Sequence, residues 1–143
     1  LLQMTYVGAP MIYYGDEVGM WGSDDPNNRK PMVWADLEQN DDPENRTMPD
    51  VLQSYKRMIA LRREYEALRT GKFETILTDD QQDVWMYRRV DEDEEILVAI
   101  NASERHAEIQ LPEGEWISIY ADVDSDAQED GIAPLSGRVW KKA

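Results

Sequence analysis

The chain has 143 residues, 41% of them hydrophobic, and its 30 acidic and 15 basic residues give a formal net charge of −15. This length suits one domain, or one small domain with part of another. The negative charge argues against nucleic-acid binding because phosphates would be repelled, no apolar run is long enough to span a bilayer, and the absence of cysteine excludes disulfide bonds and thiolate metal sites.

The N-terminal stretch carries the first strong pattern. Residues 1–5 are expected to end a helix or a loop, and residues 6–14 form an apolar run that stops at Gly15. A short apolar run between turn residues predicts a strand that is buried on both faces. Asp16 and Glu17 follow it, and the polar end of a strand is where a parallel α/β barrel places its chemistry. A core strand of any other α/β fold would show the same periodicity.

A long irregular segment and then a helix follow the predicted strand. Residues 15–45 are rich in Pro and Asp, and connections of this length are often functional. A capping-box pattern at residues 47–50 predicts the start of a helix. Apolar residues at helical spacing over 51–68 predict one helix of roughly twenty residues, which Gly71 would end.

After Gly71 the sequence changes to short runs of β-forming residues separated by turn residues. The expected strands are residues 72–78, 83–90, 96–101, 107–111, 115–120, 132–135 and 138–141. Turns are expected at 112–114 and 136–137, and the charged stretch 91–95 is expected to be a hairpin turn. Several strands at this spacing predict an antiparallel β-sandwich.

Three consecutive motifs resemble a known family. They are residues 8–20 (GAPMIYYGDEVGM), 25–29 (DPNNR) and 30–34 (KPMVW). Together they resemble the eighth barrel strand and the following loop of α-amylase-family glycoside hydrolases. The likeness is strongest to the cyclomaltodextrinase, neopullulanase and maltogenic-amylase branch, or to a related bacterial α-amylase. It continues through the predicted helix and, more loosely, into the β-rich tail.

The resemblance implies an α+β fold in two parts. Residues 1–71 would be the last strand, the substrate-side loop and the last helix of a (β/α)8 barrel, and residues 72–143 an antiparallel β-sandwich C-terminal domain. A complete barrel needs about 250 residues, so the chain would be the C-terminal part of such an enzyme.

The function that the resemblance implies is that of a retaining glycoside hydrolase acting on α-glucans such as starch, maltodextrin, cyclodextrin or pullulan. The family's nucleophile, acid/base and third carboxylate lie on earlier barrel strands, and none of their motifs occurs here. We therefore expect the parent protein to be an enzyme that needs no cofactor, and this chain alone to be inactive. A cytoplasmic location is favoured because the sequence shows no signal-peptide pattern.

Asp25 and Arg29 are the predicted substrate-binding residues. In the family, the aspartate and arginine of this motif contact sugar hydroxyls in a glucose subsite. A carboxylate can accept hydrogen bonds from two neighbouring hydroxyls, and a guanidinium offers a rigid fork of donors. The alternative is an ion pair that only braces the loop. One loop cannot enclose a ligand, so sugar contact is expected in the intact enzyme only.

Other candidate sites are rejected on the sequence. Asp16 and Glu17 would point in opposite directions at a strand end, so they receive no catalytic role. The spacing of Asp122, Asp124 and Asp126 resembles a calcium loop, but alanine occupies the two positions that need Gly and Glu. No metal site is therefore predicted. Three tryptophans lie in predicted strands, where packing in the core is favoured over an exposed sugar platform: Trp85, Trp116 and Trp140.

Two other functions and one partner stay open. The β-rich part could act by itself as a carbohydrate-binding or structural module, or the chain could belong to a non-catalytic amylase-like protein that serves an interaction. An apolar strand at residues 6–14 without barrel neighbours would expose unpaired backbone groups. We therefore expect it to pair with another copy, to fold back on the last helix, or to aggregate.

The dispersed acidic charge, with only five lysines among the 15 basic residues, suggests a protein from a concentrated-salt environment. An ordinary acidic protein is the alternative. Salt screens repulsion between like charges. The melting temperature should therefore climb steeply as KCl rises from millimolar to molar concentration, and a flat response would count against a halophilic source.

Overall fold

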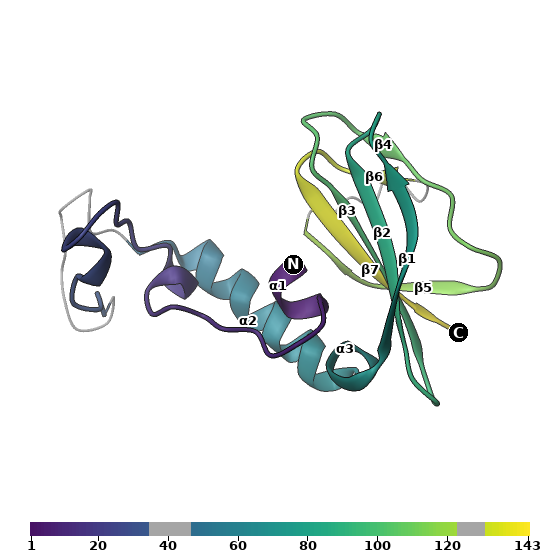
Figure 1. Cartoon of the computed structure of the whole chain (residues 1–143), viewed down its shortest axis with the longest axis horizontal. Helices are drawn as coiled ribbons and strands as arrows, with labels where there is room; N and C mark the ends of the chain where they lie inside the picture. The colour runs from purple at the N-terminus through teal and green to yellow at the C-terminus, as the bar shows by residue number, and fades with distance from the viewer. Residues whose placement is uncertain (35–46, 123–130) are drawn as a thin grey trace. The chain divides into compact units, whose positions relative to one another are not determined.

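The computed structural model describes residues 1–34, 47–122 and 131–143, which fall into two compact units (Figure 1). Unit 1 contains residues 1–9 and 62–143, and unit 2 contains residues 10–61. This division differs from a boundary at residue 71, because residues 1–9 and 62–71 pack with the sheet that follows them. Whether residues 1–71 derive from a barrel stays a prediction.

Unit 1 is built on a five-stranded antiparallel sheet with the strand order β1-β2-β3-β7-β5. Its strands are β1 (Lys72–Asp79), β2 (Val84–Val90), β3 (Glu95–Asn101), β5 (Trp116–Ala121) and β7 (Ser136–Lys142). A second sheet pairs the short strands β4 (Ala107–Glu108) and β6 (Gly131–Ile132). The antiparallel all-β character predicted for the C-terminal half is therefore confirmed, with β4 and β6 shorter than expected.

One face of the five-stranded sheet packs on the short sheet. Met86, Leu97, Ala99 and Trp140 of the large sheet form a buried cluster with Ile132 of β6. Partly buried apolar side chains close around this cluster: Ile76, Leu77, Ile109, Leu111 and Trp116. This cluster is the core between the two sheets.

The other face of the sheet is covered by two short helices, α1 (Leu2–Thr5) and α3 (Ala67–Thr70) (Figure 1). The Tyr87 hydroxyl and Thr5 Oγ1 share a buried hydrogen bond of 2.6 Å. Burial raises the pKa of Tyr87 to about 12, so the phenol stays neutral. Because successive side chains of a strand alternate between the faces, coverage on both sides buries β3 almost throughout and explains its unbroken apolar sequence.

The predicted single helix over residues 51–68 is wrong, because two helices occupy this region. Helix α2 (Pro49–Glu64) begins with proline in its first turn, as expected, and α3 starts after a break at residues 65–66. The carboxylate of Glu94, from the turn between β2 and β3, accepts a 2.9 Å hydrogen bond from the Ala67 amide. The Arg69 guanidinium donates to the carbonyls of Arg62, at 3.0 Å, and Arg63. These side chains thus supply hydrogen-bond partners to the backbone at the end of α2 and at the start of α3.

The predicted strand at residues 6–14 is also wrong. The chain leaves α1 at Thr5, and residues 6–14, all of them described, join no sheet. A strand needs a partner for its backbone groups. Here the carbonyl oxygens of Met4, Tyr6 and Gly8 instead accept hydrogen bonds from the Arg62 guanidinium, at 2.8, 3.2 and 2.6 Å.

The turn predicted at residues 136–137 lies two residues earlier. Pro134 and Leu135 form it, and Leu135 adopts a left-handed φ of 48°. Ser136 and Gly137 belong to β7. The Leu1 side chain lies where a Cβ of residue 137 would be, so Gly137 leaves room for Leu1. The residue marks a close contact and not a chain reversal.

A buried asparagine holds the loop after β3. The Asn101 side-chain amide donates to the carbonyls of Arg105, Ile132 and Ala133 at 2.7–3.2 Å, and its oxygen accepts from the Ser103 amide and hydroxyl. The adjoining Ala102 amide donates to the Asp83 carbonyl at 2.9 Å. This network ties the end of β3 to the β6 region.

Among the described residues of unit 1, Arg89 is the most deeply buried charge, with 1% of the residue exposed. Its guanidinium donates to the carbonyls of Thr5, Leu68 and Gly71 at 2.8–2.9 Å. Burial, and next the charge of Arg62, lower the pKa of Arg89. Arg89 thus joins α1, α3 and the start of β1 through backbone oxygens.

Replacing Arg89 with methionine should destabilise the protein strongly, because three buried carbonyls lose their donor. We expect a loss of about 2–4 kcal/mol in the free energy of unfolding, measured by urea denaturation. Arg88→Met is the matched control on the opposite face of β2, where Arg88 pairs with partly exposed Glu74 and with Glu95. The control should lose less than about 1 kcal/mol. Equal losses in the two variants would contradict this assignment.

Glu95 should make stability depend on pH. Its carboxylate accepts from Arg88 at 2.8 Å and from Lys142 at 2.9 Å. Burial raises the pKa of Glu95, but Lys142 and Arg88 together outweigh burial and hold it below its ordinary value of 4.5. A lowered pKa means that the carboxylate stabilises the fold above pH 4.5 and loses this effect as the pH falls through the folded-state pKa.

At pH 7, Glu95→Gln should lower the free energy of unfolding by about 1 kcal/mol. The difference from the unmodified protein should shrink as the pH drops below 4.5. Glu92→Gln, in the exposed turn between β2 and β3, serves as the control and should have little effect at either pH. A Glu95→Gln deficit that does not vary with pH would disprove the role of this charge.

Candidate functional site

The loop after residue 14 starts with a short 3-10 helix held between two glycines. Helix η1 (Asp16–Val18) lies between Gly15, with φ 93°, and Gly19, with φ 66°, and this left-handed conformation favours glycine. The Glu17 carboxylate accepts a 2.9 Å hydrogen bond from the Gly15 amide. The Met48 amide donates to the Val18 carbonyl at 2.7 Å. Glu17 therefore has a local structural role.

A second 3-10 helix, η2 (Asn27–Arg29), ends with the predicted substrate residue Arg29, and Asp25 lies two residues before its start. Arg29 Nη2 and Asp25 Oδ2 lie 2.6 Å apart, and their side chains are 65% and 57% exposed. Asp24 fixes the start of η2, because its side chain accepts from the Asp25 amide and its carbonyl accepts from the Asn27 amide. The structure thus brings Asp25 and Arg29 together on an exposed surface. An ion pair this exposed adds little stability.

A shallow cavity of about 120 Å³ lies beside η2. It is lined by two phenols, an indole, two amides and a few other groups: Tyr13, Tyr14, Gly15, Asp16, Met20, Trp21, Gly22, Asn27, Asn28 and Lys30. Asp25 and Arg29 are not part of this lining. Asn27 and Asn28 of η2 thus line the cavity, whereas the ion pair joins Asp25, which precedes η2, to Arg29 at its end.

The surroundings of Tyr14 and Tyr55 favour the neutral form of both phenols. The rings of Tyr13 and Tyr14 lie 4.9 Å apart between centroids. Desolvation, and next the Tyr13 side chain, raise the pKa of Tyr14 above its ordinary value. Desolvation, and then the charges of Asp16 and Glu17, raise the pKa of Tyr55 on α2. Neutral phenols can both donate to and accept from a polyhydroxylated ligand.

A second, apolar hollow of about 390 Å³ lies in the same unit. Most of its lining is hydrophobic: Val18, Met32, Val33, Trp34, Met48, Pro49 and Leu52, with Glu17 and Thr47 beside them. This lining offers surface for apolar packing. It presents few groups that could bind or activate a polar substrate.

The described residues contain neither a cluster arranged for a metal ion nor a helix suited to span a membrane. Over residues 1–34, 47–122 and 131–143, no group of three or more His, Asp or Glu side chains is arranged to hold a metal ion. Asp124 and Asp126 lie outside this range, and Asp122 accepts hydrogen bonds from the Tyr120 hydroxyl and the Gly137 amide. No helix in the described part of the chain has the length and apolar character needed to cross a bilayer.

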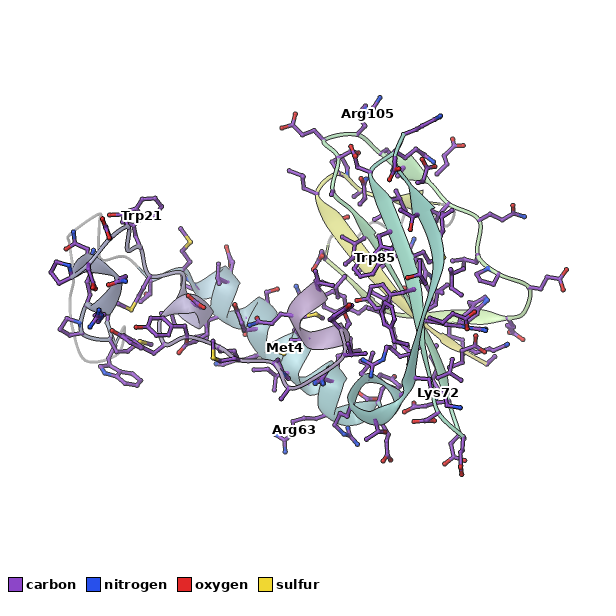
Figure 2. All side chains as sticks on the ribbon, in the orientation of Figure 1. Met4, Trp21, Arg63, Lys72, Trp85 and Arg105 are labelled. Atoms are coloured by element: carbon purple, nitrogen blue, oxygen red, sulfur yellow. The ribbon has the colours of Figure 1, made fainter. Side chains whose placement is uncertain are left out.

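The tryptophans of the sheet unit are largely engaged in packing, as the sequence predicted. Trp140 is buried in the core, and Trp116 is half-buried and donates to the Pro112 carbonyl at 2.9 Å. Trp85 (labelled in Figure 2) packs against Phe73 and Tyr87, with interplanar angles of 57° and 47°. Tilted rings of this kind do not form a flat platform for a sugar.

Sequence reasoning identified η2 but missed the aromatic residues around it. Trp21 (labelled in Figure 2) is 70% exposed although it is the largest side chain at the cavity. One feature of the sequence could have pointed to Trp21. It is a tryptophan between Gly19 and Gly22, in an irregular segment whose residues show no apolar periodicity that would place it in a core. Asn27 and Asn28 lie inside the motif itself, but their positions give no hint that they face a cavity.

Residues 73–127 match the family described as "Maltogenic Amylase, C-terminal domain". A cyclomaltodextrinase of Geobacillus thermopakistaniensis is 40% identical over 120 residues, which are 82% of this chain and 19% of the relative. Neopullulanase 2 of Thermoactinomyces vulgaris is 36% identical over 115 residues, 79% of this chain and 18% of the relative. The chain therefore spans about a fifth of the length of these curated relatives.

The fold has close counterparts among solved structures. The crystal structure of an α-amylase from H. orenii superimposes with a TM-score of 0.80 and 25% identity, over 98% of this chain and 33% of that chain. A structure described as a cyclomaltodextrinase gives a TM-score of 0.70 with 27% identity, over 99% of this chain and 24% of that chain. The resemblance that rested on residues 8–34 is thus confirmed by independent comparisons.

Proposed function

We propose that this chain, which belongs to the α-amylase family, is the C-terminal part of a retaining glycoside hydrolase. Within the family it is homologous to the C-terminal region of α-glucan hydrolases. Its substrates would be α-glucans such as starch, maltodextrin, cyclodextrin or pullulan. The observation that carries this proposal is the sequence identity with a cyclomaltodextrinase, which extends over most of the chain and includes more than the matched C-terminal domain.

In this proposal the two units have different roles. Residues 1–71 correspond to the last strand, the following loop and the last helix of a (β/α)8 barrel. The loop in unit 2 forms part of the substrate-side rim. Residues 72–143 form the β-sandwich domain that closes the chain. The absence of sheet pairing at residues 6–14 is consistent with a segment that needs partners from the rest of a barrel.

Asp25 and Arg29 are the proposed sugar contacts. The carboxylate accepts hydrogen bonds from two neighbouring hydroxyls of one glucose unit, and the guanidinium holds the carboxylate and donates to the sugar. Two observations support this role: the 2.6 Å contact between the two side chains, and their exposure on a loop beside a cavity. A pair that only braced the loop would gain little stability at such exposure.

The catalytic carboxylates would come from the rest of the parent enzyme. The chain alone should therefore be inactive, because binding contacts cannot replace a nucleophile and a general acid. A stand-alone carbohydrate-binding module is less well supported, since the sheet tryptophans are buried or tilted against neighbours. Self-association through the N-terminal segment and a halophilic source stay predictions.

Conservative replacement of the proposed pair in the complete enzyme tests this role. Asp25→Asn and Arg29→Lys should each lower kcat/KM on maltodextrin about 10- to 100-fold, because hydroxyl contacts in a subsite are lost. Arg63→Lys, on an exposed part of α2, is the matched control and should behave like the unmodified enzyme. Values within twofold for all three variants would show that the pair only braces the loop. Hydrolysis of maltodextrin by the purified 143-residue chain would refute its proposed inactivity.

A further inference from the structure

We infer that Trp21 is a third sugar-contacting residue, whose indole provides the stacking surface for a glucose ring of the α-glucan at the cavity beside η2. The inference rests on the proposed function and extends it, because it assigns the aromatic surface of the site in addition to its hydrogen-bonding pair.

Trp21 presents a largely exposed indole in this chain. The residue is 70% exposed, and an indole offers one of the largest apolar surfaces among the side chains. Burying such a surface would stabilise the fold, so leaving it in water forgoes a substantial hydrophobic contribution. A ligand that covers the ring would recover this contribution on binding.

The surroundings of Trp21 match a sugar better than an apolar partner. The cavity that it lines also contains the amides of Asn27 and Asn28, the ammonium of Lys30 and the phenol of Tyr13. A glucose ring has an apolar C–H face and a rim of hydroxyls, so it can stack on an indole while its hydroxyls bind amides and phenols. Trp34, which is 54% exposed, lines the apolar hollow instead and lacks these polar neighbours.

The position of Trp21 relative to η2 is set by a close backbone contact. A Cβ at the next residue, Gly22, would lie 2.7 Å from the Asn27 carbonyl oxygen and 3.0 Å from the Asn28 Cα. Only glycine allows this approach. The segment that carries Trp21 therefore packs directly on the backbone of the helix that also holds Arg29, so that the indole and the ion pair belong to one loop.

The size of the cavity indicates what it can take. A volume of about 120 Å³ is well below the several hundred Å³ of an enclosing ligand pocket. The cavity can therefore receive part of one ring of a longer glucan and not a whole oligosaccharide.

The test uses the complete enzyme and three variants. Trp21→Ala should raise KM for maltodextrin about 3- to 10-fold, the range expected of one stacking contact, with kcat within twofold. Trp21→Phe should retain most of the affinity because a smaller aromatic face remains. Ile117→Ala, an exposed apolar residue of β5, is the control and should leave both constants unchanged. Thermal melting of each variant checks that the fold is retained.

A spectroscopic readout separates stacking from a packing role. Titration with β-cyclodextrin should give a near-ultraviolet difference spectrum of a perturbed indole, and Trp21→Phe should abolish it. Unchanged KM in Trp21→Ala, or an undiminished spectrum in Trp21→Phe, would overturn the inference while leaving the hydrolase proposal intact. If the complete unmodified enzyme hydrolysed none of these α-glucans, the proposed function itself would fail.

Discussion

Two buried guanidinium groups, those of Arg62 and Arg89, hold unit 1 together. Between them they donate to six backbone carbonyls, four of which belong to residues 4–8. The carbonyls at the end of a helix carry partial negative charge. They can therefore stabilise a buried guanidinium in place of a carboxylate. Desolvation is the largest influence that lowers the pKa of both arginines, yet a guanidinium remains protonated in proteins. The N-terminal residues are therefore fixed to a sheet that begins more than sixty residues later.

This arrangement explains several departures from the local sequence pattern. Helix α3 is separated from α2 because Glu94 and Arg69 supply hydrogen bonds at the break, and Arg89 then binds the carbonyl of Leu68 inside α3. In the N-terminal segment, the carbonyls of residues 4–6 and 8 accept hydrogen bonds from the two arginines and not from a neighbouring strand. In each case the deciding partner is distant in sequence. The spacing of apolar residues in a sequence shows which face of a helix or strand is buried. It does not show which distant residues will form hydrogen bonds with it.

The strands of the large sheet could be predicted because alternation, turn residues and β-forming side chains agreed over residues 72–101. The turn predicted at Gly137 was wrong because glycine occurs both in turns and at close contacts. Only the position of Leu1 shows that Gly137 belongs to a close contact. At the candidate site, Asp25 and Arg29 could be found from their spacing within a family motif. Trp21 could not, since its significance depends on exposure and on the neighbours that line its cavity, neither of which is encoded in local spacing.

The network around Asn101 has a consequence for chemical ageing. Asparagine deamidates when the next backbone nitrogen attacks the side-chain amide, and it is one of the thermolabile residues of proteins. Here the amide is held by three carbonyls and the nitrogen of Ala102 is engaged with Asp83, so neither reacting group is free to approach the other. Position 101 should therefore keep its original side chain for as long as the sheet stays folded.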